Sequence, residues 1–173
     1  MQEMIDIYDG ERRRTGEVIP REGAFLREGQ YMLYILALIE DAQGRFLITQ
    51  RSWDKHWGAG WWEITGGGVR AGESSADALR REIPEEVGLA VPAEVPAPVY
   101  SYVNVDLKRG DNYFVDIYHL RLDFSASDVQ LVDGEAIGFK LATWDEVSAL
   151  AEKGIFLHYE RLRQALEAEG YFA

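Results

Sequence analysis

The chain has 173 residues, no cysteine and a formal net charge of −12 at pH 7. This charge argues against nucleic acid or an anionic membrane surface as the main partner, because both would repel the protein. The lack of cysteine excludes disulfides, thiolate metal sites and a cysteine nucleophile. The acidic start MQEMIDIYDG has no signal-peptide pattern, and the longest apolar run, 31–39, is too short to cross a bilayer, so we expect a cytoplasmic protein.

The first third of the chain predicts strands. Two short strands around a loop with Asp9-Gly10 and Gly16 make residues 1–28 an N-terminal β-hairpin extension. Residues 31–40 are apolar at nearly every position, which is typical of a strand buried on both faces, and 45–50 should return antiparallel to it. A short strand then leads into three glycines, 66–68, which can take positive φ and let the backbone approach a ligand closely.

Residues 67–89, GGVRAGESSADALRREIPEEVGL, predict a helix that glycines open and close. Ser74 and Asp77 stand at the spacing of a capping box, and the apolar residues behind them recur at helical spacing. Pro84 lies between the glutamates of this helix. Because proline cannot donate to the Arg80 carbonyl and disfavours helical geometry at Ile83, we expect a kink or an early helix end there.

The rest of the chain predicts a hairpin, a strand and two helices. Strands at 99–107 and 112–122 alternate well around a turn, and 137–141 reads as a final strand. Thr143 and Glu146 form a second capping box, so residues 143–173 should hold two C-terminal helices. No repeat or linker divides the chain, and this order of elements favours a single α/β domain over 1–173, with a mixed sheet flanked by helices.

Three glutamates of the 67–89 helix form a candidate metal site. Glu82, Glu85 and Glu86 fall within about one third of the helix circumference, at the C-terminal end where the dipole disfavours anions. On an exposed face their repulsion would be small. In a cleft, a divalent cation would offset it, and Mg²⁺ fits best because it prefers carboxylate oxygens together with substrate phosphate oxygens.

The same segment resembles the Nudix box, G-x5-E-x7-R-E-U-x-E-E-x-G-U with U aliphatic, and matches it at every specified position. The resemblance implies an α/β/α sandwich in which the box forms a loop-helix-loop. It also implies hydrolysis of the diphosphate in a nucleoside diphosphate linked to another moiety, by water attack on phosphorus. The implied cofactor is Mg²⁺, with Mn²⁺ as an alternative, and the implied partner is a small-molecule diphosphate derived from a nucleotide.

The resemblance also assigns roles to residues. Glu82 and Glu86 would ligate the metal directly, Glu85 directly or through water, and a backbone carbonyl near Gly66 would add a further ligand. Arg81 and Glu73 would form an ion pair that supports the helix. Thus, the catalytic set predicted from the box is Arg81, Glu82 and Glu85, joined by a base from a later loop.

The base and the substrate contacts lie outside the box. The base predicted from the resemblance is Glu135, with Asp133 as its rival and Glu82 as the alternative within the box. Arg51 resembles a position where relatives hold phosphate, and Trp57, in a loop, is the best aromatic residue for stacking on a base. Most other aromatic residues, Tyr102 and Tyr113 included, are expected in the core, and the three histidines are assigned no role.

Two other functions compete with hydrolysis. Isopentenyl diphosphate isomerase shares the Nudix fold and its metal use, and the N-terminal layout of this chain has some likeness to isomerase-like Nudix proteins. That enzyme, however, relies on a cysteine that this chain lacks. A regulatory module would bind a nucleotide without cleaving it, and Pro84 is the residue in its favour. The complete set of glutamates favours the hydrolase. A homodimer is compatible with the sequence, which does not specify the base, sugar or leaving group of the substrate.

Overall fold

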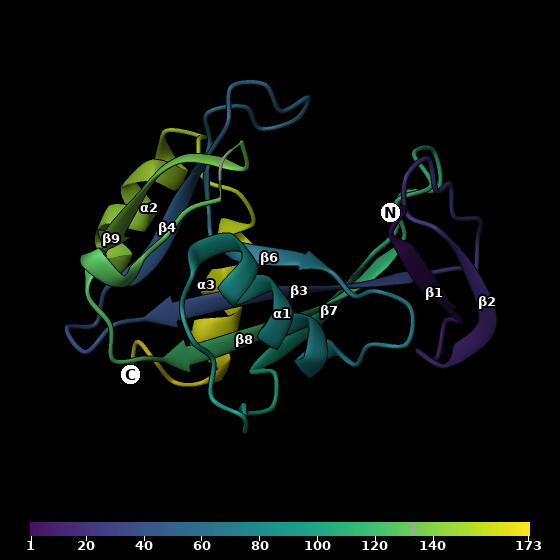
Figure 1. The fold of residues 1–173 in the computed structure, drawn as a ribbon, viewed down its shortest axis with the longest axis horizontal. Helices are drawn as coiled ribbons and strands as arrows, with labels where there is room; N and C mark the ends of the chain where they lie inside the picture. The colour runs from purple at the N-terminus through teal and green to yellow at the C-terminus, as the bar shows by residue number, and fades with distance from the viewer. Residues whose placement is uncertain (133) are drawn as a thin grey trace.

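The computed structural model describes residues 1–132 and 134–173, and Figure 1 shows their arrangement. Strands β1 (Met4–Tyr8) and β2 (Arg14–Pro20) pair antiparallel as the predicted N-terminal hairpin. The hairpin lies at one end of the larger sheet, and α2 (Trp144–Glu152) with β9 (Ala136–Ala142) lies at the other. A bridge between Tyr8 and Tyr31 joins the hairpin to the start of the larger sheet.

Strand β3 (Met32–Glu40) is the centre of the larger, mixed sheet. It runs parallel to β8 (Tyr113–Arg121), which pairs antiparallel with the edge strand β7 (Tyr100–Asn104). On its other side β3 pairs antiparallel with β6 (Thr65–Gly68). The remaining strands form the far side of the sheet: β4 (Phe46–Arg51), β5 (Trp62–Glu63) and β9.

The predicted antiparallel return of 45–50 onto 31–40 is confirmed at a single register pair, Glu40 with Phe46. Beyond that pair β4 leaves β3 and pairs along its length with β9, and its other end pairs with β5. The place beside the middle of β3, residues 34–37, is taken by β6. This divergence brings the end of β4, at Arg51, and the glycines of β6 to the same region of the molecule.

Helices cover both faces of the sheet, and the alternation of β3 explains why. Leu33, Ile35, Ala37 and Ile39 face the apolar side of α1 (Ser75–Val87), whereas Leu38 belongs to the second core cluster. That second cluster includes Val147 of α2 and three residues of α3 (Tyr159–Ala168), namely Leu162, Ala165 and Leu166. The predicted α/β/α sandwich with a mixed sheet is therefore confirmed. In the described ranges, the helices are too short or too polar to cross a membrane.

The expected early end of the helix at Pro84 is wrong. Helix α1 continues to Val87 and closes at Gly88, whose φ of 72° is left-handed and whose N–H donates to the Pro84 carbonyl over 3.1 Å. Ile83 and Val87, on either side of the proline, are completely buried against the sheet. Helix stability in proteins comes mostly from packing of the apolar face, so this burial holds the last turn in place.

His119 of β8 lies buried between two carboxylates. Its Nε2 is 2.6 Å from Glu40 Oε2, and its Nδ1 is 2.5 Å from Glu169 Oε2, just beyond α3. Removing the imidazole takes away the shortest contact of the Glu40 carboxylate, which is 10% exposed and lies 3.3 Å from Arg121. The imidazole therefore joins the sheet to the C-terminal segment.

We expect His119→Ala to lower the free energy of unfolding by about 3–5 kcal/mol, because it removes a buried ring that contacts two carboxylates and leaves the buried Glu40 side chain without its closest partner. Urea denaturation measures this loss. His56→Ala is the matched control, since His56 is exposed on the loop after β4. Equal stabilities of the two variants would contradict the importance given to the His119 contacts.

Candidate active site

The second half of α1 lies against the glycines of β6. Gly66, Gly67 and Gly68 are extended residues of that strand, so the predicted positive φ is wrong, whereas the predicted close approach of their backbone to a ligand stays a prediction. A Cβ atom added at Gly67 would lie 2.2 Å from Oε1 of Glu82. At Gly66 it would lie 2.7 Å from the Ile35 carbonyl oxygen. Glycine at position 67 lets a carboxylate of α1 reach the strand, and glycine at position 66 lets β3 pack closely against it.

Arg81 fixes this helix to the loop that precedes it. Its Nε donates to Glu73 Oε1 over 2.6 Å, and its Nη2 donates to Glu73 Oε2 over 2.9 Å and to the Gly68 carbonyl over 3.0 Å. Its Nη1 donates to Glu82 Oε1 over 2.6 Å and, more weakly, to Glu85 Oε2 over 3.4 Å. The predicted Arg81–Glu73 ion pair is present. The same guanidinium also orients Glu82.

The carboxylates differ in burial and therefore in the ease with which they ionise. Burial, reinforced by the nearby carboxylates of Glu82 and Glu63, raises the pKa of Glu86 to about 8. Burial also raises the pKa values of Glu82 and Glu63, against the opposing effects of Arg81 and Arg51. Glu85 is half exposed. In the described residues Glu86 has no ion pair with a basic side chain, whereas Glu63, Glu82 and Glu85 each have one. Its negative charge is therefore the least compensated of the four.

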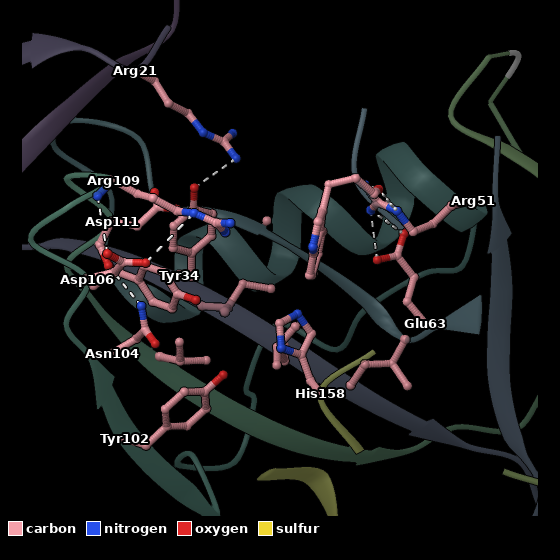
Figure 2. A pocket seen from close by; sticks show the side chains of 18 of the residues that line it. Arg21, Tyr34, Arg51, Glu63, Tyr102, Asn104, Asp106, Arg109, Asp111 and His158 are labelled. Atoms are coloured by element: carbon pink, nitrogen blue, oxygen red, sulfur yellow. Dashed lines mark hydrogen bonds and ion pairs between the residues drawn. The ribbon is translucent and has the colours of Figure 1, made fainter. Parts of the chain in front are cut away.

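Two adjoining cavities meet at these residues. The carboxylate cavity, of about 560 Å³, is lined by six glutamates and four basic side chains, Arg21, Arg51, Lys55 and Arg70. The aromatic cavity, of about 640 Å³, is shown in Figure 2 and shares part of its lining with the carboxylate cavity. Its aromatic lining comes from Tyr34, Trp57, Tyr102, Tyr113 and His158. Both cavities are lined by Glu86, Glu63, Gly66, Gly67, Arg21 and Arg51.

The donor set fits a divalent cation. Within the described ranges, no three Asp, Glu or His side chains lie close enough together to hold a metal ion as they stand. Glu82 is instead paired with Arg81. However, the six carboxylates around the cavity outnumber the four basic groups, and Glu86, half-buried among like charges, has its pKa raised to about 8. Carboxylate oxygens with uncompensated charge are what Mg²⁺ or Mn²⁺ prefers.

Comparison with known proteins identifies the family. The NUDIX domain profile matches residues 30–165. The chain belongs to the Nudix family. An uncharacterized Nudix hydrolase of Listeria monocytogenes is 29% identical over 160 residues, which cover 92% of this chain and 90% of that protein. The predicted membership is confirmed, and the chain is a Nudix hydrolase of the general pyrophosphohydrolase kind.

Solved Nudix structures share the fold. The crystal structure of DR0079 from Deinococcus radiodurans matches with a TM-score of 0.75 and 23% identity, over 94% of this chain and 99% of that one. A bifunctional NMN adenylyltransferase/ADP ribose pyrophosphatase of Francisella tularensis, complexed with AMP and a manganese ion, matches with a TM-score of 0.61 and 19% identity. This match covers 79% of this chain and 41% of that protein.

The structure brings most of the residues predicted from the Nudix box to the carboxylate cavity. Glu82, Glu85, Glu86 and the backbone of Gly66 line it. Glu135 lines it from an exposed segment and forms a 2.9 Å ion pair with Lys55. Asp133, the rival base, lies outside the described residues. Glu73 lies behind the box helix, in contact with Arg81, as its supporting role requires.

Arg51 and Trp57, the predicted substrate contacts, lie together beside the aromatic cavity. The Arg51 guanidinium lies 5.6 Å from the Trp57 ring centroid, and its Nε and Nη2 donate to the Trp57 carbonyl. Its Nη1 donates to both oxygens of Glu63. All three nitrogens of Arg51 are therefore already engaged in holding the loop of 52–61, whereas the Trp57 side chain is 56% exposed and available for stacking.

Sequence reasoning missed several residues of this Nudix site. Tyr102 and Tyr113, expected in the core, line the aromatic cavity, and so does His158, which was assigned no role. Alternate residues of a strand share a face, so the strand pattern of β7 could have placed Tyr102 on the same face as Asn104. Both residues line the cavity. Glu63 and Arg21 line both cavities. No sequence signal marks Arg21, because it lies 45 or more residues from the Nudix box.

Proposed function

We propose that this Nudix hydrolase uses a divalent cation to cleave the diphosphate of a nucleoside diphosphate linked to a second group. The observation that carries the proposal is the shared wall of the two cavities. A carboxylate-rich cavity suits metal-bound phosphates, and an aromatic cavity directly beside it suits a nucleoside. A diphosphate ester lying across Glu86 and Gly67 would occupy both.

The residues of the box would hold the cation. Glu82, Glu86 and the Gly66 carbonyl are its proposed ligands, and Glu85, which is more exposed, is a ligand directly or through water. When bound, the cation supplies charge neutralisation for the diphosphate and lowers the pKa of bound water. Arg81 keeps Glu82 oriented through its 2.6 Å hydrogen bond, and Glu73 holds Arg81 in place.

Glu135 is the proposed base. It lies at the rim of the carboxylate cavity, where an ionised carboxylate can accept the proton of the attacking water. Lys55 Nζ lies 2.9 Å from Glu135 Oε2 and holds the carboxylate at this rim. Glu82 is less suited to this role, because Arg81 and the proposed cation already occupy its oxygens. Glu135→Gln should therefore reduce turnover while leaving metal binding in place.

The other moiety of the substrate would lie in the aromatic cavity. Trp57 offers an exposed ring at its edge, and Tyr102 and Tyr113 line its interior. The Francisella neighbour, crystallised with AMP and manganese, supports a nucleotide in combination with a divalent ion. The proposed partner is thus a small-molecule diphosphate and not a nucleic acid. The cytoplasmic location and a homodimer stay predictions.

A substrate panel with and without metal tests this function. Nucleoside triphosphates, sugar nucleotides, dinucleoside polyphosphates and isoprenoid diphosphates are incubated with Mg²⁺, with Mn²⁺ or with EDTA, and phosphate-containing products are separated. We expect release of a phosphate product from a nucleotide member of the panel only when metal is present. Equal product in EDTA would contradict the metal role, and isomerisation of the isoprenoid diphosphate would favour the competing isomerase.

A further inference from the structure

The N-terminal hairpin lies outside the part of the chain that matches the NUDIX domain, which begins at residue 30. It is nevertheless bonded to the loop that leads into α1. The Ala71 N–H donates to the Met4 carbonyl and the Gly72 N–H donates to Asp6 Oδ2, both over 2.8 Å. Arg14 Nη2 donates to the Glu73 carbonyl over 2.6 Å. The hairpin is thus held against the loop that precedes α1.

Arg21, one residue beyond β2, extends from this hairpin to the place where the two cavities meet. It lines both of them, and Figure 2 shows its guanidinium directed toward the Tyr34 hydroxyl. Nη2 lies 3.4 Å from that hydroxyl, and the guanidinium carbon lies 5.2 Å from the centroid of the Tyr34 ring. Nη1 donates to both oxygens of Glu3, over 3.1 and 3.2 Å.

These contacts do not use all of the hydrogen-bond donors of Arg21. A guanidinium has five N–H groups, and within the described residues the Nε of Arg21 has no acceptor while its bond to Tyr34 is long. The side chain is 33% exposed. Arg51, the other arginine that lines both cavities, differs because each of its nitrogens already donates to Glu63 or Trp57. Arg21 is therefore the better placed of the two for an incoming anion.

We propose that Arg21 binds a phosphate group of the substrate at the junction of the two cavities. The identity of that ligand as a diphosphate rests on the proposed function. The acidic side chains that line the carboxylate cavity would repel a phosphate, and a guanidinium that lines both cavities would offset part of this repulsion in addition to metal. A planar guanidinium is suited to this, because it donates two parallel hydrogen bonds to phosphate oxygens. The hairpin thereby becomes part of the substrate site.

Binding of methylene diphosphonate, which resists hydrolysis, tests this proposal. Calorimetric titration in the presence of Mg²⁺ should show that Arg21→Ala weakens binding roughly 10- to 100-fold, since a charge-assisted hydrogen-bond pair is lost. Arg21→Lys should be weakened several-fold, because it keeps the charge and loses the planar donor pair. Arg27→Ala is the matched control, since Arg27 is exposed in the same segment and lines neither cavity.

Glu3→Gln separates phosphate binding from a structural ion pair. If Arg21 only held the hairpin in place through Glu3, Glu3→Gln would weaken diphosphonate binding as much as Arg21→Ala does. If Arg21 binds phosphate, Glu3→Gln should bind as tightly as the unchanged protein or more tightly, because a competing carboxylate is gone. Should Arg21→Ala fail to fold, Arg21→Lys and Glu3→Gln still decide between the two roles.

The test distinguishes this inference from the proposed function. Suppose that Arg21→Ala weakens diphosphonate binding but the unchanged protein hydrolyses no member of the panel. This result would reject the hydrolytic function and keep the phosphate site. Hydrolysis with equal diphosphonate affinity in Arg21→Ala and Arg27→Ala would overturn the phosphate site and keep the hydrolytic function. In an active protein, the KM of Arg21→Ala should rise more than its kcat falls.

Discussion

Glu86→Gln should reduce metal-dependent hydrolysis by roughly 10³-fold while the protein remains folded. Glu86 is the one box glutamate that lines both cavities. A glutamine keeps the shape of the side chain and removes the charge that a cation would neutralise. Initial rates on the substrate found in the panel, measured across a Mg²⁺ titration, give the loss of turnover and the change in metal dependence separately.

The same substitution should stabilise the metal-free protein, so its effects on turnover and on stability have opposite signs. The pKa of Glu86 is raised to about 8, chiefly by burial and then by Glu82 and Glu63. This value exceeds the ordinary pKa of an unfolded glutamate, so the folded state binds the proton more tightly. Consequently, stability is highest below the unfolded pKa and is lost as pH rises toward about 8. Glu86→Gln removes this decrease in stability with rising pH, because glutamine does not ionise.

Urea denaturation in EDTA between pH 5 and 8 checks the stability effect, and repeating it with Mg²⁺ checks the metal. The stability advantage of Glu86→Gln should grow with pH in EDTA, and Mg²⁺ should stabilise the unchanged protein more than the variant. Glu94→Gln is the matched control, because Glu94 is exposed and lines neither cavity. Normal turnover in Glu86→Gln would mean that the metal assignment is wrong.

Local signals predicted the fold well. The capping boxes at Ser74 and Thr143 are both present, and the continuous apolar run of 31–40 is β3, buried on both faces as expected. Signals of this kind depend on neighbours in the sequence. The early end expected at Pro84 failed because a local penalty was outweighed by packing of Ile83 and Val87 on the sheet, which a local pattern does not contain.

The candidate site was predictable only where it lies within the Nudix box. Arg81 of α1 and Glu73 of the loop before it have a fixed spacing within the box, so their contact could be expected. Glu63 and Arg21 come to the site through pairing of β4 with β5 and docking of the N-terminal hairpin, contacts between distant segments. The role expected for Arg51 illustrates the same limit, because its nitrogens are engaged by Glu63 and by the Trp57 carbonyl.

Gly67→Ala should cost far more in activity than in stability. The new Cβ would lie 2.2 Å from Oε1 and 2.4 Å from Cδ of Glu82, so one of the two must move. The atoms it meets are the end of a flexible side chain, and the carboxylate can therefore turn away from the strand without unfolding the helix. We expect a loss of about 1–3 kcal/mol in the free energy of unfolding, the usual cost of a modest overpacking.

The displaced carboxylate is the one that Arg81 orients toward the proposed metal. A misplacement of about 1 Å in a catalytic group can reduce turnover about 100-fold, and we expect a loss of that size in kcat for Gly67→Ala. Gly138→Ala is the matched control, since Gly138 lies in β9, has no left-handed φ and leaves a new Cβ without any neighbour within 4 Å. Equal turnover of the two variants would contradict the requirement for glycine at position 67.

A double-mutant cycle identifies the cause of that loss. If Gly67→Ala acts by displacing Glu82, it should reduce turnover little further in a Glu82→Gln background, because the metal ligand is already impaired. Independent effects of the two changes would instead place the damage in the strand, where Gly67 pairs with Ile35 of β3. The cycle therefore tests whether the glycine-rich strand serves the fold or the placement of a carboxylate, and the 2.2 Å approach favours the carboxylate.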